Sequence, residues 1–514
     1  MAGDEAPTAR TSRGELVGAK AGGVCVFRGV RYAQPPTGPR RFAPPVPLER
    51  WDGPRPALEP GPACPQGMGS AAPPVPARPP VFGGLFGPGA HGTSEDCLHL
   101  TVWTPACDRG RRPVLVFIHG GAFRLGTSTA PTYDGARLAA RGDVVVVACN
   151  YRLGPFGFLH LPELGAVNLG LLDQVAALEW VAAEIESFGG DPAAVTVFGE
   201  SAGAKSIECL LAMPAASGLF RSAILESTYA PGMDPAVAAD FARAVAEAAG
   251  AGTDPRALAE LPADALLGAV TEVQLRSGPN LWGGAIGPVV DGTVLPEHPV
   301  AAAAAGSTHP VPLVVGTTAD EARLFGSMAP GWLEVGPAEL TQRLAAVVAG
   351  VPGAPPAAEL APAYRRARAA RGHSSEPADI LYAVQTDRLF RQHSIALAER
   401  HAGHQPHVWM YLFSWSAAGE TALGACHALE LPFVFGTLDG PTAALTGTDE
   451  RAWALSATMA DAWIGFARDG VPGALSWPRY EPTRRATLQL GESVAVLDDP
   501  EADERALWRD ARWW

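Results

Sequence analysis

The amino-acid sequence predicts an α/β fold with a large, mostly parallel central sheet flanked by helices. Short apolar runs that are typical of buried strands alternate along the chain with longer segments of helical spacing. One such segment, Leu169–Phe188, carries Leu172, Val175, Leu178 and Val181 along one side, as an amphipathic helix does. Buried strands joined by helices indicate a parallel sheet that is covered on both faces.

The first part of the chain predicts an edge of the sheet and a long loop. Short apolar runs alternate with turn residues at the start, as in Gly22–Phe27, which favours antiparallel strands. Pro and Gly are dense from Pro54 to Gly92, so this segment is expected to be a surface loop. Buried strands are then predicted at Leu98–Trp103, Val114–His119 and Val144–Tyr151.

The rest of the chain predicts further strands separated by long helical stretches. Strands are expected at Ala194–Phe198, Ser222–Glu226, Val311–Gly316, His407–Ser414 and Thr487–Leu490. Helices are expected at Ala236–Gly268, Pro337–Arg371, Ser374–Arg400 and Arg451–Arg468. The helical stretches between strands are expected to form a cap over the C-terminal edge of the sheet, where open α/β sheets bind ligands.

No Gly/Ser linker or block of charge divides the chain. This predicts one domain over residues 1–514, with cap-forming insertions at roughly 54–92, 229–310 and 326–405.

The composition limits the partners of the protein. The 514 residues carry a formal net charge of -14, which argues against nucleic acid and anionic membranes as partners. Met1–Arg13 is polar, and no stretch approaches the roughly 18 apolar residues of a membrane span, so we expect a cytoplasmic protein unless a leader was removed. The seven cysteines show no Cys-x-x-Cys spacing, and no metal site is expected. The composition leaves the oligomeric state open.

Two motifs point to attack on a carbonyl group. A glycine-rich loop, His119–Phe123, follows one predicted strand, and Gly199-Glu200-Ser201-Ala202-Gly203 follows another and leads into a helical segment. A serine on a sharp strand-to-helix turn is the arrangement of a nucleophile, and its flanking glycines avoid collisions in the strained turn. Backbone N–H groups of the glycine-rich loop can hold the oxyanion that forms. The motifs therefore predict Ser201 as a nucleophile.

A serine nucleophile needs a base, and the base needs an anionic partner. In a strand–turn–helix arrangement the acid follows the serine and the base comes last, which eliminates the early histidines His91, His99, His119 and His160. Asp320 and Glu321 directly follow a predicted strand, and the residues alone do not choose between them. His427 lies in the loop after another predicted strand and is the expected base. Activity is then expected to rise with pH through a midpoint at roughly pH 6–7.

Other late histidines lie in helical, polar segments. They are expected to be ordinary surface residues: His373, His393, His401 and His404.

Beyond these motifs, the chain resembles a known family over nearly its whole length. The similar segments are residues 27–36 with 41–42, 95–98 and 100–103, 150–158, 168–174, 188–192, 316–325 and 424–435. In this order they resemble the type-B carboxylesterases, the lipase and cholinesterase branch of the α/β-hydrolases. The resemblance implies an α/β-hydrolase fold and a serine hydrolase that cleaves carboxylic esters through an acyl-enzyme. The alternatives are an amidase, lactonase or carbamate hydrolase with the same catalytic groups, or a non-catalytic binding protein.

The resemblance also assigns residues to roles. By position it makes Ser201 the nucleophile, His427 the base and Glu321 the acid. The mechanism needs no metal or organic cofactor, and the expected partner is a small-molecule ester.

The expected oxyanion hole consists of the backbone N–H groups of Gly121, Ala122 and Ala202. Their small side chains let the backbone approach a substrate oxygen.

Further positions match features that the resemblance marks as structural. It implies ion pairs between Arg41 and Glu95 and between Arg152 and Asp173, a serine near the acid and base at Ser227, and a site at Cys64 and Cys97 where relatives often form a disulfide. Glu200 is expected to shape the local field and not to belong to the triad. The segment Pro65–Asp96 has no tryptophan, which argues against choline esters as substrates. Candidate pocket walls are Phe82–Phe86, Leu281–Ile286, Leu324–Met328 and Phe390, although ordinary core packing is the favoured interpretation of the aromatic residues there.

Overall fold

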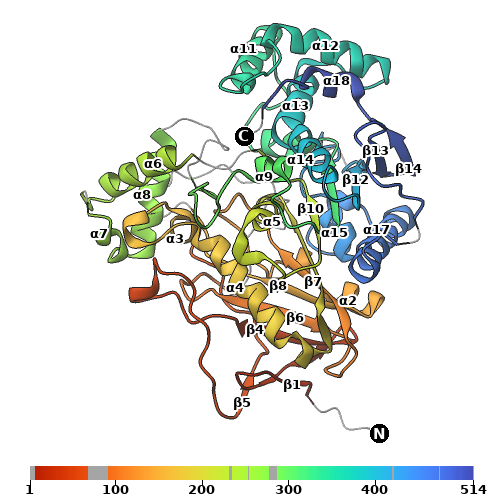
Figure 1. Ribbon diagram of the computed structural model, residues 1–514. Helices are drawn as coiled ribbons and strands as arrows, with labels where there is room; N and C mark the ends of the chain where they lie inside the picture. The colour runs from red at the N-terminus through yellow and green to blue at the C-terminus, as the bar shows by residue number, and fades with distance from the viewer. Residues whose placement is uncertain are drawn as a thin grey trace.

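An 11-stranded sheet forms the centre of the computed structural model, which describes residues 6–67, 91–230, 234–252, 254–276, 286–418, 422–473 and 475–512 (Figure 1). The strand order is β14-β13-β12-β11-β10-β9-β7-β8-β6-β4-β3, and a small sheet β1-β2-β5 lies apart from it. Neighbouring strands from β8 to β13 are all parallel, whereas both ends of the sheet are antiparallel. The predicted mostly parallel sheet with antiparallel strands at its N-terminal edge is therefore confirmed.

The longest of the described strands is β9, with 11 residues. The strands are β1 (Thr8–Arg10), β2 (Glu15–Val17), β3 (Ala19–Ala21), β4 (Val24–Arg31), β5 (Pro54–Pro56), β6 (His99–Thr104), β7 (Arg112–Ile118), β8 (Val145–Cys149), β9 (Gly190–Glu200), β10 (Ser222–Glu226), β11 (Leu313–Thr318), β12 (Val408–Phe413), β13 (Ala486–Leu490) and β14 (Val494–Asp498).

Helices connect most of these strands. The α-helices are α2 (Ala136–Gly142), α3 (Gly154–Phe158), α4 (Leu169–Glu184), α5 (Ala202–Ala212), α6 (Pro235–Ala248), α7 (Arg256–Ala259), α8 (Ala263–Arg276), α9 (Pro299–Ala305), α10 (Glu321–Gly326), α11 (Pro337–Val348), α12 (Ala357–Ala370), α13 (Pro377–Thr386), α14 (Gln392–Ala402), α15 (Leu431–Phe435), α16 (Ala443–Thr446), α17 (Glu450–Asp469) and α18 (Ala502–Leu507). The 3₁₀ turns are η1 (Gly38–Arg40), η2 (Pro131–Tyr133), η3 (Pro162–Leu164), η4 (Ile185–Phe188) and η5 (Pro214–Ala216), and η6 (Asp387–Arg391) is a π-helical turn.

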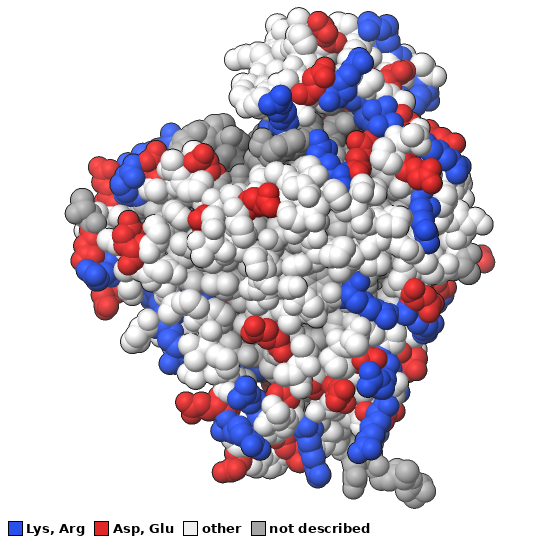
Figure 2. Space-filling model, in the orientation of Figure 1, with Lys and Arg blue, Asp and Glu red and all other residues white. Residues whose placement is uncertain are grey.

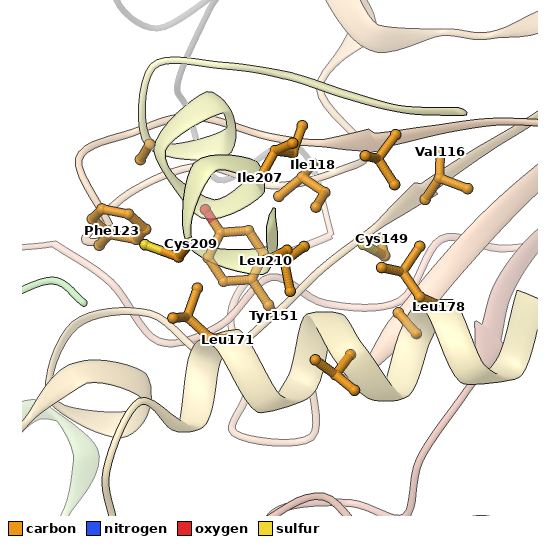
Figure 3. Close-up of a cluster of buried hydrophobic side chains, with 14 of the residues drawn as sticks. Val116, Ile118, Phe123, Cys149, Tyr151, Leu171, Leu178, Ile207, Cys209 and Leu210 are labelled. Carbon is orange, nitrogen blue, oxygen red and sulfur yellow. The ribbon is translucent and has the colours of Figure 1, made fainter. Parts of the chain in front are cut away.

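Both faces of the sheet are covered, and the alternation of side chains along each strand divides the core in two. Val116 and Ile118 of β7 point toward α4 and α5, where Figure 3 shows them among other buried apolar side chains. Leu115 and Phe117 of the same strand point to the other face, which is covered by α2, α15 and α17. Because both faces are dry, the central strands are continuously apolar in sequence.

A third apolar cluster lies among the helices that connect β11 to β12. Leu344 of α11, Leu360 of α12 and Ile380 of α13 pack together with Trp508, which directly follows α18. Figure 1 shows these helices at one end of the molecule, with α6, α7 and α8 grouped separately beside the sheet. The division of the chain into one domain with three cap insertions stays a prediction.

The structure differs from the sequence prediction in several elements. Residues 54–92 contain β5, and Leu169–Phe188 ends in the 3₁₀ turn η4. The helix predicted over Ser374–Arg400 is interrupted by the π-helical turn η6, and the antiparallel edge strand β14 was not predicted. Strand β14 is mostly exposed, so it lacks the buried apolar run by which the other strands are recognised.

Charge is dispersed over the surface that Figure 2 presents. Acidic and basic side chains are intermixed around the margins of this face, and its middle is largely uncharged. Over the described ranges, none of the helices is both long and apolar enough to cross a membrane.

Candidate active site

Ser201 occupies the sharp turn that its motif predicts. It joins the end of β9 to the start of α5 with φ 56° and ψ -118°, and this left-handed φ is uncommon for a residue with a side chain. The turn is held by the Ser201 N–H, which donates to the carbonyl oxygen of Glu226 at 2.9 Å. A Cβ atom on Gly203 would lie 1.9 Å from the carbonyl oxygen of Ile118, so only glycine permits this close approach of backbone.

The structure places Glu321, and not Asp320, against the predicted base. The Nδ1 atom of His427 lies 2.5 Å from Oε2 of Glu321, and both side chains are buried. The other carboxylate oxygen, Oε1, accepts hydrogen bonds from the Thr318 N–H at 2.7 Å and from the Ser227 hydroxyl at 2.6 Å. The carboxylate is therefore fixed on one side by two donors and on the other by the imidazole.

Asp320 has a different task. Its Oδ2 atom accepts from the N–H of Ala425 at 3.0 Å, and its Oδ1 atom pairs with Arg323. Asp320 therefore links α10, which begins at Glu321, to the loop that carries His427.

The second imidazole nitrogen faces another carboxylate. The Nε2 atom of His427 lies 2.9 Å from Oε1 of Glu200, although these atoms are not aligned for a hydrogen bond. In the described parts of the chain, no hydrogen bond joins the Ser201 hydroxyl to His427. Glu200 therefore lies in direct contact with the expected base, whereas the sequence predicted only an effect on the local electrostatic field.

The two carboxylates govern the proton affinity of His427. Burial alone would lower the pKa of this histidine, but Glu200 and Glu321 outweigh it and raise the pKa to about 10. The predicted midpoint at roughly pH 6–7 took no account of the buried carboxylate at Nε2, which favours a higher midpoint.

Two more buried carboxyl groups lie beneath the turn. Burial, and then the charge of Glu200, raises the pKa of Glu226 to about 8, and Trp463 Nε1 donates to it at 2.9 Å. Burial and the neighbouring glutamates raise the pKa of Glu430 well above its usual range. Burial likewise raises the pKa of Glu200, with His427 opposing it. Neighbouring carboxylates favour protonation of one another, so the carboxyl group of Glu226 is mainly protonated at neutral pH.

The glycine-rich loop presents backbone donors beside the serine. Gly121 and Ala122 have φ values of 111° and 54°, and a Cβ on Gly121 would meet the carbonyl oxygen of Leu125 at 2.1 Å. Within the described residues, the N–H groups of Gly121, Ala122 and Ala202 donate to no protein acceptor. Three donors that are not used by the fold are what an oxyanion site requires.

His119 holds this loop in place. Its Nδ1–H donates to the carbonyl oxygen of Gly120 at 2.8 Å, and its ring stacks on Tyr151, whose hydroxyl donates to the carbonyl oxygen of His119. Burial lowers the pKa of His119 to about 4, so the ring stays neutral. The histidine that chain order eliminated as a base therefore has a structural role.

Aromatic rings border the base. The ring centroids of Phe325 and Phe390 lie 5.0 and 4.8 Å from that of His427, and their role as pocket walls stays a prediction. The expected wall segments Phe82–Phe86 and residues 281–285 lie outside the described residues, whereas Ile286 is buried beside the described core.

Two histidines contradict the expectation of a surface position. His393 and His401 are buried, because α14 packs one face against the sheet and α9. His393 Nε2 lies 2.9 Å from Glu208, and His401 Nε2 donates to the carbonyl oxygen of Val311 at 2.9 Å. His373 and His404 are exposed, as expected. One sequence feature could have indicated a buried partner for His393: the charged residues Lys205 and Glu208 stand at helical spacing within α5.

The two expected ion pairs are present. Arg152 and Asp173 are almost completely buried and form a bidentate pair, with Nη2–Oδ1 at 2.7 Å and Nε–Oδ2 at 2.8 Å. Arg41 and Glu95 form a similar pair with more solvent contact.

Cysteine pairs and clusters of acidic or histidine side chains are the remaining features that could form a disulfide or hold a metal ion. Cys64 and Cys97 are free thiols in the structure. Across the described ranges, no group of three or more His, Cys, Asp or Glu side chains is placed to hold a metal ion.

Comparison with known proteins relates the chain to esterases. A family model described as "Carboxylesterase family" matches residues 5–508. The para-nitrobenzyl esterase of Bacillus subtilis (strain 168) is 39% identical over 502 residues, which cover 96% of this chain and 97% of that protein. The phenmedipham hydrolase of Pseudarthrobacter oxydans is 35% identical over 504 residues, which cover 96% of each chain. A solved carboxylesterase of Geobacillus stearothermophilus superposes with a TM-score of 0.83 at 38% identity, covering 98% of this chain and 100% of that one.

Proposed function

The chain belongs to the carboxylesterase family and is a serine hydrolase of carboxylic esters, and we propose that Ser201, His427 and Glu321 are its catalytic triad. The observation that carries this assignment is the Glu321–His427 contact at 2.5 Å beside the strained turn of Ser201. We include Gly121 and Ala122 as donors of the oxyanion hole, together with the N–H of Ala202.

The proposed reaction has two halves. His427 takes the proton of the Ser201 hydroxyl as its oxygen attacks the ester carbonyl, and the backbone N–H groups hold the oxyanion. The alcohol leaves with a proton from His427, and an acyl-enzyme remains. Water, deprotonated by His427, then releases the carboxylic acid. Glu321 holds the imidazole in one tautomer and stabilises its charged form.

The substrate class follows from the relatives and from the site. We propose a small-molecule ester, bound beside Phe325 and Phe390, whose rings supply an apolar wall next to the base. A set of p-nitrophenyl esters of increasing acyl length tests this, with labelling by a fluorophosphonate probe as the measure of an active serine. Hydrolysis with no labelling, or labelling away from residue 201, would contradict the assignment.

The pH dependence of the reaction tests the role of Glu200. Because the neutral imidazole is the base, activity is lost as pH falls through the pKa of His427, which the carboxylates raise. In Glu200→Gln the imidazolium loses one stabilising charge, so its pKa falls and the acid limb of kcat/KM moves to lower pH by about one unit or more. The measurement is kcat/KM for a p-nitrophenyl ester across pH.

An exposed glutamate gives the control for this prediction. Glu247→Gln on α6 makes the same chemical change far from charge partners of the imidazole, and its acid limb is expected to match the wild type. An acid limb that stays in place in Glu200→Gln would show that Glu200 does not set the proton affinity of the base.

A further inference from the structure

A second buried ionic group lies along the helix that follows the nucleophile. Lys205 and Glu208 of α5 form an ion pair with Nζ–Oε1 at 3.0 Å, and both side chains are almost completely buried. His393 of α14 brings its Nε2 atom to 2.9 Å from Oε2 of Glu208. Charges are rarely buried in this way unless several donors compensate them.

The donors to Glu208 come from three different segments. Lys205 belongs to α5, His393 to α14, and the hydroxyl of Thr228, which also donates to Glu208, belongs to the connection after β10. Burial would raise the pKa of Glu208, but His393, Lys205 and the Thr228 hydroxyl outweigh it and bring the pKa below its usual range. Burial keeps His393 neutral by lowering its pKa, so His393 serves Glu208 as an N–H donor.

Thr228 is the link between this cluster and the proposed triad. The preceding residue, Ser227, has a left-handed φ of 58° and donates its hydroxyl to Oε1 of Glu321 at 2.6 Å. Its backbone N–H donates to the carbonyl oxygen of Gly316, and the carbonyl oxygen of Thr228 accepts from Ser394 at 3.3 Å. The strained Ser227 conformation is therefore held on one side by the sheet and on the other by Thr228.

Stability alone gives no reason for this arrangement. Replacing a buried ionic group by apolar side chains of similar volume is often neutral or stabilising, so the charges add little that an apolar core would lack. The charged groups instead orient the Thr228 hydroxyl, because a carboxylate with donors on both oxygens fixes that hydroxyl in one orientation.

We propose that Glu208, held by Lys205 and His393, is a positioning residue that fixes Thr228 and, through the adjacent Ser227, keeps the Glu321 carboxylate aligned with His427. The inference rests on the proposed triad. Its consequence is that a group two turns along the nucleophile helix controls the proton affinity of the base.

The test removes one hydroxyl group. Thr228→Val keeps the shape of the side chain but removes its donor to Glu208, and kcat is expected to fall about tenfold with KM changed less than about twofold. A less well aligned Glu321 stabilises the imidazolium less, so the acid limb of the pH profile moves down by about half a unit. Thr228→Ser restores the hydroxyl and is expected to recover most of both losses.

A matched control separates positioning from packing. Thr196→Val, on β9, removes a buried hydroxyl that pairs with Ser222 at 2.7 Å and has no contact with the triad. Both valine variants are expected to lower stability similarly, and only Thr228→Val to change kcat and the pH profile. Wild-type kcat and an unmoved acid limb in Thr228→Val would overturn the proposal.

A second variant tests the cluster itself. Lys205→Met combined with Glu208→Gln removes both charges together, and the same loss of kcat and the same downward shift are expected. Wild-type values in this double variant would also overturn the proposal. The groups facing His427, namely Glu200, Glu321 and the rings of Phe325 and Phe390, are unchanged in every variant. Failure of the proposed triad would be distinguished by wild-type protein that is not labelled at Ser201.

Discussion

Ser201→Ala is expected to lower hydrolysis of a p-nitrophenyl ester by roughly 10,000-fold to 1,000,000-fold. The hydroxyl oxygen is the atom that forms the covalent bond in the proposed mechanism, whereas the hydroxyl of Ser227, another serine with a left-handed φ near the triad, donates to Glu321. The residual rate would come from the backbone donors and from substrate binding, which the substitution leaves in place. Steady-state kinetics with single-turnover measurement of the released p-nitrophenol provide the readout.

The control for this variant is an exposed serine. Ser217→Ala, after η5, makes the same change at the surface and is expected to keep wild-type kcat and fluorophosphonate labelling. The Ser201→Ala protein is expected to unfold at the same denaturant concentration as the wild type, because the change removes a single oxygen atom from a small side chain. A rate within tenfold of the wild type would refute the nucleophile assignment.

Arg152→Met is expected to cost about 3–5 kcal/mol in the free energy of unfolding. The guanidinium pairs with Asp173 in a site where both side chains are about 1% exposed or less, and it also donates to the carbonyl oxygens of Arg41 and Ala43. Methionine has similar volume but leaves the Asp173 carboxylate without its counter-charge, and an uncompensated buried charge is the main penalty. Chemical denaturation followed by fluorescence measures the loss.

Two further variants sharpen this prediction. Arg137→Met breaks an ion pair with Asp439 in which both side chains are about half exposed, and its cost is expected to stay below about 1 kcal/mol. Arg152→Met combined with Asp173→Leu removes both buried charges and is expected to recover much of the loss. Equal destabilisation by Arg152→Met and Arg137→Met would show that burial does not decide the strength of the pair.

The parts of the site that sequence predicts well are those encoded within a few neighbouring residues. The turn at Ser201 is predicted by glycines on both sides of a serine, because this short motif is typical of a tight strand-to-helix turn, although the backbone that Gly203 approaches belongs to Ile118 of β7. The same holds for Gly121 in the oxyanion loop, and for β7, whose unbroken apolar run reports burial on both faces.

The parts that sequence predicts poorly depend on groups that are distant along the chain. Asp320 and Glu321 are adjacent and chemically alike, and only the path of the loop carrying His427 decides which one faces the imidazole. His393 was expected at the surface because its own helix is polar, but α14 packs against the sheet and α9, and the buried ring donates its N–H to Glu208 of another helix. Such a contact between two helices cannot be predicted from the composition and residue spacing of either segment alone.

By itself the sequence determined which chemical groups the protein has available and the local turn that exposes the nucleophile, since steric limits and periodicity act over a few residues. The tertiary structure alone decided the proton affinities: that His427 lies between Glu200 and Glu321, and that Glu208 lies among Lys205, Thr228 and His393. The physical reason is that a pKa depends on burial and on charges within a few ångströms, and both are set by the order of strands in the sheet and the packing of helices against it.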